Sequence, residues 1–218
     1  MKRNLNIYKN NKINFILYII FFYSVWLLKE EWTGYIESFS NDFSTFFNAF
    51  IKILIWIIPT WIYIKFCLKE EFNSYIKLNT NIKKGFTYGI IITLLLGINF
   101  FVKTYLIEKT SFYIPSNFNQ YINSIFIAGF TEEIVYRGLI LNELQKRYNF
   151  FKSNIITAIL FLIIHYPTWL NNEEFLILHN HIYILLLSLF LGYIYKKTNS
   201  LWAVIIIHSF HNLFVILN

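Results

Sequence analysis

Three charged side chains, Glu132, Glu133 and Arg137, lie within six residues of one apolar segment. The residues on either side, 121–130 and 139–141, are mainly apolar and predict a helix that crosses a membrane. A charged side chain at the centre of a bilayer costs about 2.5–3.5 kcal/mol on insertion scales. These three must therefore face protein or water and have partners, and we interpret them as a candidate functional site.

Two later apolar segments carry polar residues at a comparable depth. His165 lies in one of them, and His208 and Asn212 lie in the other. With a helical rise of ~1.5 Å per residue, counted from the span ends on one side, Glu132 and His165 lie about 18 Å deep. On the same count Asn212 lies about 16 Å deep and His208 about 10 Å. Residues from three separate helices therefore fall in one slab of the membrane and can converge.

The spacing along each helix separates the roles of these residues. Glu133 and Arg137 are four residues apart, on one helix face, which favours an ion pair. Glu132 lies about 100° round the helix from Glu133, so it can face a different neighbour and is the better base. His208 and Asn212 are also four residues apart and project toward one site.

A carboxylate, two imidazoles and an amide can activate a water molecule and stabilise an oxyanion. In this interpretation Glu132 removes the proton while His165 positions the water. His208 and Asn212 then donate hydrogen bonds. A structural alternative stays open, because an intramembrane Glu–Arg pair can simply hold helices together, and a single buried histidine is more often a core residue than a catalyst.

A metal site is the second alternative. Glu132, His165 and His208 could supply three ligands with an open fourth position, as catalytic zinc requires. The sequence has no His-x-x-x-His or His-Glu-x-x-His pair, however, and asparagine is an uncommon zinc ligand. We therefore expect no metal cofactor, with a divalent metal such as zinc as the alternative. His211, three residues after His208, is predicted to serve in packing or in support of the site.

The composition is that of a membrane protein. Of the 218 residues, 56% are hydrophobic and 14% are charged, whereas soluble domains carry about 25% charged residues. The net charge of +7 is spread over short loops between apolar runs, so we expect a lipid bilayer and no nucleic acid as partner. The single cysteine, Cys67, excludes an intrachain disulfide and a zinc site built on several cysteines.

Seven apolar runs approach the length of about 20 residues that a membrane-spanning helix needs. They cover residues 13–28, 49–68, 86–102, 121–144, 153–170, 182–195 and 201–217. We predict an all-α, polytopic membrane helical bundle of about seven transmembrane helices, with six to eight allowed by the two short runs. Pro59 should kink the second span, and residues 171–178 could hold a short interfacial or re-entrant piece.

The loop charges predict the orientation. One set of alternate loops carries 13 of the 19 lysines and arginines, and the other set carries three. Since the basic loops of membrane proteins stay in the cytoplasm, the N-terminus is predicted to be cytoplasmic. With seven spans, the C-terminus then lies on the opposite side.

The polar groups resemble the motifs of the CAAX protease and bacteriocin-processing family (CPBP, also called Abi) of intramembrane endopeptidases. The three motifs of that family are Glu-Glu-x-x-x-Arg, Phe-x-x-x-His and His-x-x-x-Asn. They are matched by residues 132–137, by Phe161 and His165, and by His208 and Asn212. Each motif alone is weak, but three in order on separate spans make a specific match.

The resemblance covers about residues 122–217. The first 120 residues match only as membrane spans. We therefore expect one integral-membrane domain, in which residues 1–120 form the divergent N-terminal spans and residues 121–218 form the CPBP/Abi catalytic core.

The resemblance implies hydrolysis of peptide bonds in a hydrophobic or membrane-delivered peptide or protein. Glu132 and His165 would activate the water, and His208 and Asn212 would form the oxyanion site. Glu133 and Arg137 would support them. Members of the family have been described both as glutamate-type proteases and as metalloproteases.

Family members act in several settings. In eukaryotes they remove the last three residues of prenylated CAAX proteins, and in bacteria they are linked to bacteriocin self-immunity, peptide maturation and non-catalytic scaffolding. The Ile, Asn, Lys and Phe bias is typical of an AT-rich bacterial genome, so we expect a bacterial plasma-membrane protein in peptide maturation or bacteriocin immunity. The alternatives are a non-catalytic immunity or scaffold protein, prenyl-protein processing, and a small transporter, for which the sequence offers no inverted repeat. The sequence leaves the substrate and the oligomeric state open.

Overall fold

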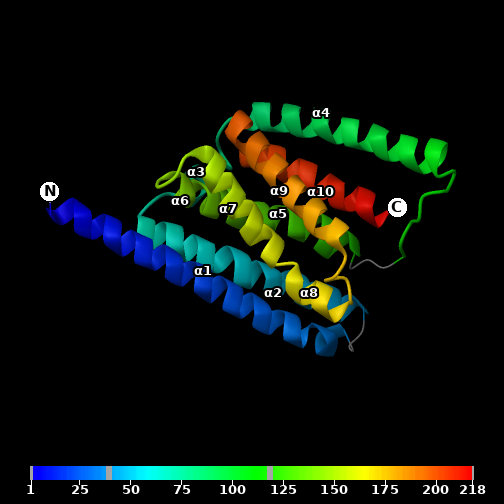
Figure 1. Cartoon of the computed structure of the whole chain (residues 1–218). Coiled ribbons are helices and arrows are strands. Elements are labelled where there is room, and N and C mark those ends of the chain that lie inside the picture. The colour runs from blue at the N-terminus through cyan, green and yellow to red at the C-terminus, as the bar shows by residue number, and fades with distance from the viewer. Residues whose placement is uncertain (1, 38–40, 117–119, 218) are drawn as a thin grey trace.

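The computed structural model describes residues 2–37, 41–116 and 120–217, and this part of the chain contains helices and no strand. The helices are α1 (Lys2–Glu37), α2 (Asn41–Ile62), η1 (Tyr63–Leu68), α3 (Phe72–Tyr75), α4 (Ile82–Phe101), η2 (Val102–Ile107), η3 (Gln120–Ala128), α5 (Gly129–Glu133), η4 (Ile134–Leu141), α6 (Asn142–Gln145), α7 (Phe150–Ile163), α8 (Tyr166–Asn171), α9 (Leu178–Thr198) and α10 (Leu201–Ile216). The η elements are wider, π-helical turns that continue an adjacent helix. Elements η3, α5, η4 and α6 thus form one continuous helix, residues 120–145, here called the motif helix (Figure 1).

Five helical segments of the described chain are long and apolar enough to cross a membrane. They are Lys12–Thr33, Phe43–Leu68, Ile82–Ile107, Phe150–Asn171 and Leu178–Thr198. The other two predicted spans are also helical. Helix α10 is apolar but has only 16 residues, and the motif helix is long but carries four charged residues. The protein is therefore an all-α, polytopic membrane bundle, as predicted.

The first span is longer than predicted. Helix α1 continues to Glu37, so residues 29–31, assigned to a loop from their charges, are helical. Lys and Glu are good helix formers, and no glycine or proline interrupts the chain before residue 34. Glu30 is buried against the neighbouring helices. Its charge therefore does not face lipid, and the helix can continue through this residue.

The fifth span is broken where the sequence suggested a continuous helix. Helix α7 ends at Ile163 and α8 begins at Tyr166. Pro167 has no backbone N–H, and its ring would clash with the carbonyl of Ile163, four residues earlier. At the break, Trp26 of α1 donates a hydrogen bond to the carbonyl of Ile164 (3.2 Å). Residues 172–177, where the sequence allowed a short interfacial or re-entrant piece, form turns and no helix.

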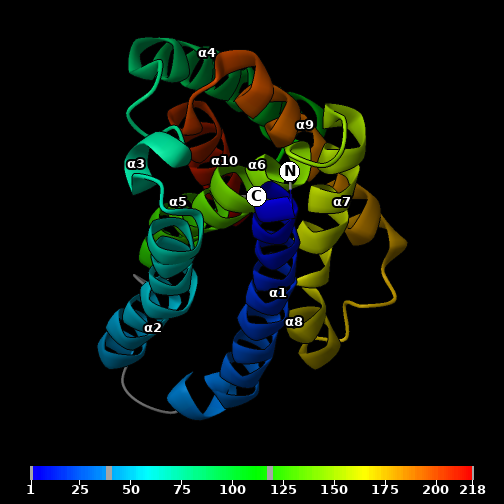
Figure 2. The ribbon, with the colours of Figure 1, turned by 90° about the vertical axis from the view of Figure 1, so that its left-hand side faces the viewer.

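The motif helix lies inside the bundle, with α1 and α2 on one side and α4 on the opposite side (Figures 1 and 2). All of residues 131–141 are buried. Helix α10 packs against both α4 and the motif helix. At the second contact, a Cβ atom added to Gly129 would lie 3.0 Å from the backbone nitrogen of Ser209. A glycine at this contact lets two membrane helices approach closely, which places the turn with Glu132 beside His208.

We predict that Gly129→Ala destabilises the bundle by about 1–3 kcal/mol, because the added methyl group presses on the backbone of α10. The control is Gly97→Ala in α4, whose added Cβ would meet only the ring edge of Phe214 (3.1 Å), a side chain that can move. The measurement is the unfolding midpoint of the purified protein in detergent. Equal midpoints for the two variants would contradict the proposed contact.

Candidate active site

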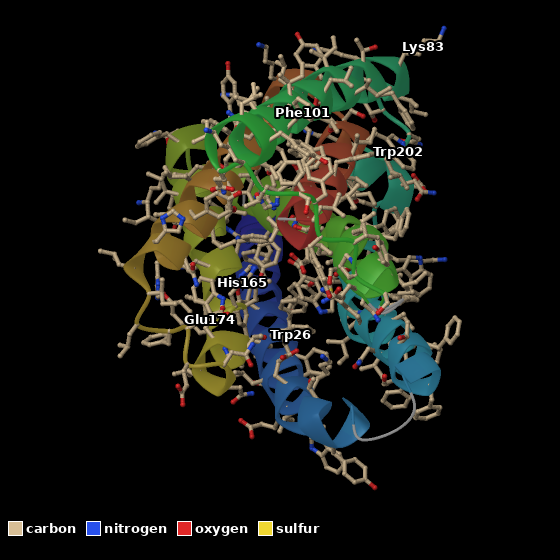
Figure 3. All side chains as sticks on the ribbon, turned by 90° about the vertical axis from the view of Figure 1, so that its right-hand side faces the viewer. Trp26, Lys83, Phe101, His165, Glu174 and Trp202 are labelled. Carbon is tan, nitrogen blue, oxygen red and sulfur yellow. The ribbon has the colours of Figure 1, made fainter. Side chains whose placement is uncertain are left out.

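A cavity of about 430 Å³ lies between α1, α2, the motif helix, the α7–α8 junction and α10. Three of the residues predicted from the motifs line it: Glu132, His165 and Asn212. The rings of Trp26 and Trp169 form an aromatic part of the cavity wall. Trp26 and His165 are labelled in Figure 3. The volume lies in the range of small-molecule and peptide sites, ~300–1,000 Å³.

Glu132 is 7% exposed and has a cationic partner that the sequence analysis missed. Its Oε1 lies 2.8 Å from Nζ of Lys52 in α2. The same ammonium also lies 5.1 Å from the ring of Trp56 and 5.6 Å from that of Trp26. A signal was present in the sequence, since Lys52 is a cation within an apolar span and needs a partner for the same reason as Glu132.

Glu133 is fully buried and forms the predicted ion pair with Arg137: its Oε1 accepts from Nη1 at 2.7 Å. Nη2 of Arg137 donates to the carbonyl and hydroxyl oxygens of Ser188 in α9, at 2.9 and 2.8 Å. A charge pair buried without such partners would be strongly destabilising. The pair therefore joins the motif helix to α9 and holds Glu133 in place.

His208 lies between the two glutamates. Its Nδ1 is 2.7 Å from Oε1 of Glu133, and its Nε2 is 3.9 Å from Oε2 of Glu132. Because the Glu133 carboxylate accepts hydrogen bonds, Nδ1 carries a hydrogen. The opposite ring nitrogen is thereby aimed at the carboxylate that lines the cavity. His208 does not itself line the cavity, so it acts from behind Glu132.

His165 lies at the break between α7 and α8. Its Nδ1 is 2.9 Å from the carbonyl oxygen of Phe161. A carbonyl can only accept, so Nδ1 carries the hydrogen, and in the neutral ring Nε2 keeps its lone pair. The ring packs against Phe161 and Trp169, with centroid separations of 5.1 and 5.6 Å. The helix break therefore leaves an oriented acceptor at the cavity wall.

Asn212 is held by contacts on both sides of its amide. Nδ2 donates to the carbonyl of Ser124 at 2.7 Å, and Oδ1 lies 3.2 Å from Nδ1 of His211. The other ring nitrogen of His211 lies 2.5 Å from the Tyr183 hydroxyl. The amide has two N–H groups, and Ser124 takes only one of them. His211 thus has the supporting contact with Asn212 that its position suggested.

The alternative metal site does not fit this arrangement. An ammonium group, Nζ of Lys52, lies 2.8 Å from Oε1 of Glu132, the carboxylate that would have to bind the zinc ion. A divalent cation there would also face the charge of Lys52. Among the residues that the structure describes, no three His, Cys, Asp or Glu side chains form a group that could hold a metal ion.

Comparison with known families covers the same part of the chain. Residues 114–214 match the family model described as type II CAAX prenyl endopeptidase Rce1-like. This part of the chain is similar to that family. The match confirms the predicted resemblance and includes the motif helix, His165, His208 and Asn212. Neither a curated protein nor a solved structure matches the chain.

We predict that Arg137→Met destabilises the protein by roughly 3–5 kcal/mol, because it leaves the buried Glu133 carboxylate without its cation. The double variant Glu133→Gln/Arg137→Met should regain part of this loss, since it removes both charges and keeps an acceptor for His208. Unfolding midpoints in detergent measure both effects. A double variant less stable than Arg137→Met would contradict the coupling.

Proposed function

We propose that this protein is an intramembrane endopeptidase that hydrolyses peptide bonds of a hydrophobic or membrane-delivered peptide or protein. The observation that carries the proposal is that Glu132 lies at the wall of a buried cavity together with His165 and Asn212, with His208 3.9 Å behind it. Similarity of the C-terminal part to a family of CAAX-type intramembrane endopeptidases supports it.

The first step of the proposed mechanism is activation of water. Lys52 holds one oxygen of Glu132, so the other, Oε2, accepts the proton of a water molecule in the cavity. The lone pair on Nε2 of His165 accepts the second hydrogen of that water and orients it. The water oxygen then attacks the carbonyl carbon of the scissile bond.

The second step is stabilisation of the oxyanion that this attack creates. The free N–H of Asn212, which lines the cavity, donates to it. His208 lies behind Glu132, with its Nε2 3.9 Å from Oε2, and supports that carboxylate without contacting the oxyanion. The carboxylate of Glu133, 2.7 Å from Nδ1, keeps the His208 ring in this orientation. When the tetrahedral intermediate collapses, Glu132 passes its proton to the nitrogen of the leaving amine, which restores the carboxylate.

The proposed mechanism does not involve a metal ion. Its support is the position of Lys52, which supplies a positive charge at Glu132 where a metalloprotease would have its cation. We expect EDTA and 1,10-phenanthroline to leave the activity of the purified protein unchanged. Inactivation by a chelator that added zinc reverses would contradict this proposal.

A non-catalytic scaffold or immunity protein is the second candidate. The observation that favours it is that each glutamate is already paired, Glu132 with Lys52 and Glu133 with Arg137. Such pairs would hold α2 and α9 to the motif helix without any chemistry. The composition supports a bacterial plasma-membrane protein, and the loop charges support a cytoplasmic N-terminus. The role that we propose, from the family resemblance, is peptide maturation or bacteriocin self-immunity.

We predict that Glu132→Gln lowers peptide cleavage by about 100-fold or more, the contribution of a general base. Glu143→Gln is the matched control: Glu143 is also a buried glutamate on the motif helix, is paired with Lys146, and does not line the cavity. Peptides from cells carrying each variant at equal abundance are compared by mass spectrometry. Products that persist in Glu132→Gln would favour the scaffold candidate.

We predict that Lys52→Met reduces activity about tenfold or more, since a charge-assisted hydrogen bond contributes about 1.5–3 kcal/mol. Lys52→Arg keeps the charge and should retain more activity than Lys52→Met. Cleavage rates of the purified variants, compared at equal folded fraction, provide the measurement. Full activity in Lys52→Met would show that the ammonium group has no role in the reaction.

A further inference from the structure

The cavity opens at one end of the bundle, here called the mouth end. Its outermost lining residues come from the last turns of α1, from the first half of α2, from the start of the motif helix, from α8 and from the last turns of α10. They include Lys29, Glu30, Thr33, Asn48, Asn123, Thr168 and Ile216. Figure 3 looks onto this end, with Glu174 of the α8–α9 loop labelled near its edge.

At the mouth, three side chains link α1 to α8. Oε1 of Glu30 accepts from Nζ of Lys29 at 2.9 Å, and its Oε2 accepts from the hydroxyl of Thr168 at 3.1 Å. The Lys29 ammonium also lies 5.1 Å from the ring of Trp26. The mouth is therefore lined by polar side chains whose charges are paired, next to the ring of Trp26.

The basic loops gather at the opposite end, here called the basic end, which Figure 2 faces. There the start of α4 contacts the end of α9, and the loop after the motif helix contacts α3 and the first part of α1. The contacts are Lys84 Nζ to the Lys197 carbonyl at 2.8 Å, Lys146 Nζ to the Tyr75 ring at 4.9 Å, and Arg147 to the Phe15 ring at 5.4 Å.

The cavity is closed toward the basic end by packed side chains. Residues 134–141 of the motif helix, which follow Glu132 in that direction, are all buried, as is Phe161 of α7. Gln145 lies 13 positions after Glu132, which corresponds to about 20 Å along this helix. A chain arriving at the basic end would have to displace the core to reach Glu132.

Loop charge fixes the sides of the membrane. Of the lysines and arginines outside the seven apolar runs of the sequence, 13 belong to the set at the basic end and three to the set at the mouth end. Such an excess places the basic end in the cytoplasm. The mouth therefore opens on the non-cytoplasmic side.

We propose that the substrate is an exported chain: a secreted peptide, or a segment anchored in the membrane, that enters the cavity from the non-cytoplasmic side. This inference rests on the proposed endopeptidase function and specifies its substrate class. It disfavours the C-terminus of a cytoplasmic protein as substrate, because such a tail would reach only the closed, basic end.

Thiol labelling tests the side on which the cavity opens, independently of activity. In a Cys67→Ser background, Leu176→Cys and Thr33→Cys place single thiols at the mouth end, and Lys152→Cys places one at the basic end. Leu176 is 91% exposed in the α8–α9 loop. With a membrane-impermeant maleimide, we expect the two mouth-end thiols to label fully in intact cells and Lys152→Cys to label only after permeabilisation. The reverse pattern would overturn the inference.

A thiol inside the cavity tests the route itself. Ser124 lines the cavity, and only its backbone contacts Asn212. We expect Ser124→Cys to react with a small charged thiosulfonate added outside intact cells. Reaction only from the cytoplasmic side, in inverted vesicles, would overturn the inference.

Peptide mass spectrometry then separates this inference from the proposed function. Products that depend on Glu132 and derive from exported chains support both. Products that depend on Glu132 but derive from cytoplasmic proteins overturn the inference alone. Identical peptides from wild type and Glu132→Gln overturn the proposed function, and the inferred substrate class with it, even when the labelling results stand.

Discussion

The structure depends on one constraint, which is that no charge buried in the bilayer can be left without a partner. Glu133 meets it with Arg137 and His208, and Glu132 meets it with Lys52. Each pairing reaches another helix: α2 through Lys52, α10 through His208, and α9 through the contact of Arg137 with Ser188. The charges that make the segment costly to insert therefore also determine which helices surround it.

Glu132 and Glu133 have different roles because their environments differ. Glu133 is fully enclosed, and its cation and imidazole partners fix it, so it serves as a support. Glu132 lines the cavity and leaves one oxygen directed toward His208. An adjacent pair of identical residues can thus hold different roles, since successive residues of a helix point about 100° apart.

Local backbone features bring the remaining groups into range. Gly129 allows α10 to approach the motif helix, which places His208 beside both glutamates. Pro167 ends α7 before His165, so the imidazole lies in a turn at the cavity wall rather than on the side of a continuous helix. Both features act through the backbone. The sequence analysis could estimate only how deep each residue lies in the membrane, from its position along an ideal helix.

The sequence by itself determined the membrane class, the helical fold, the motif residues and the Glu133–Arg137 pair, because hydropathy and four-residue spacing are properties of single segments. Only the tertiary structure decided that Lys52 neutralises Glu132, that His208 lies between two carboxylates and that α1 extends past residue 28. It also decided toward which end the cavity opens. These features depend on how separate helices are rotated and packed against one another, and the pattern within one helix does not specify the rotation of its neighbours.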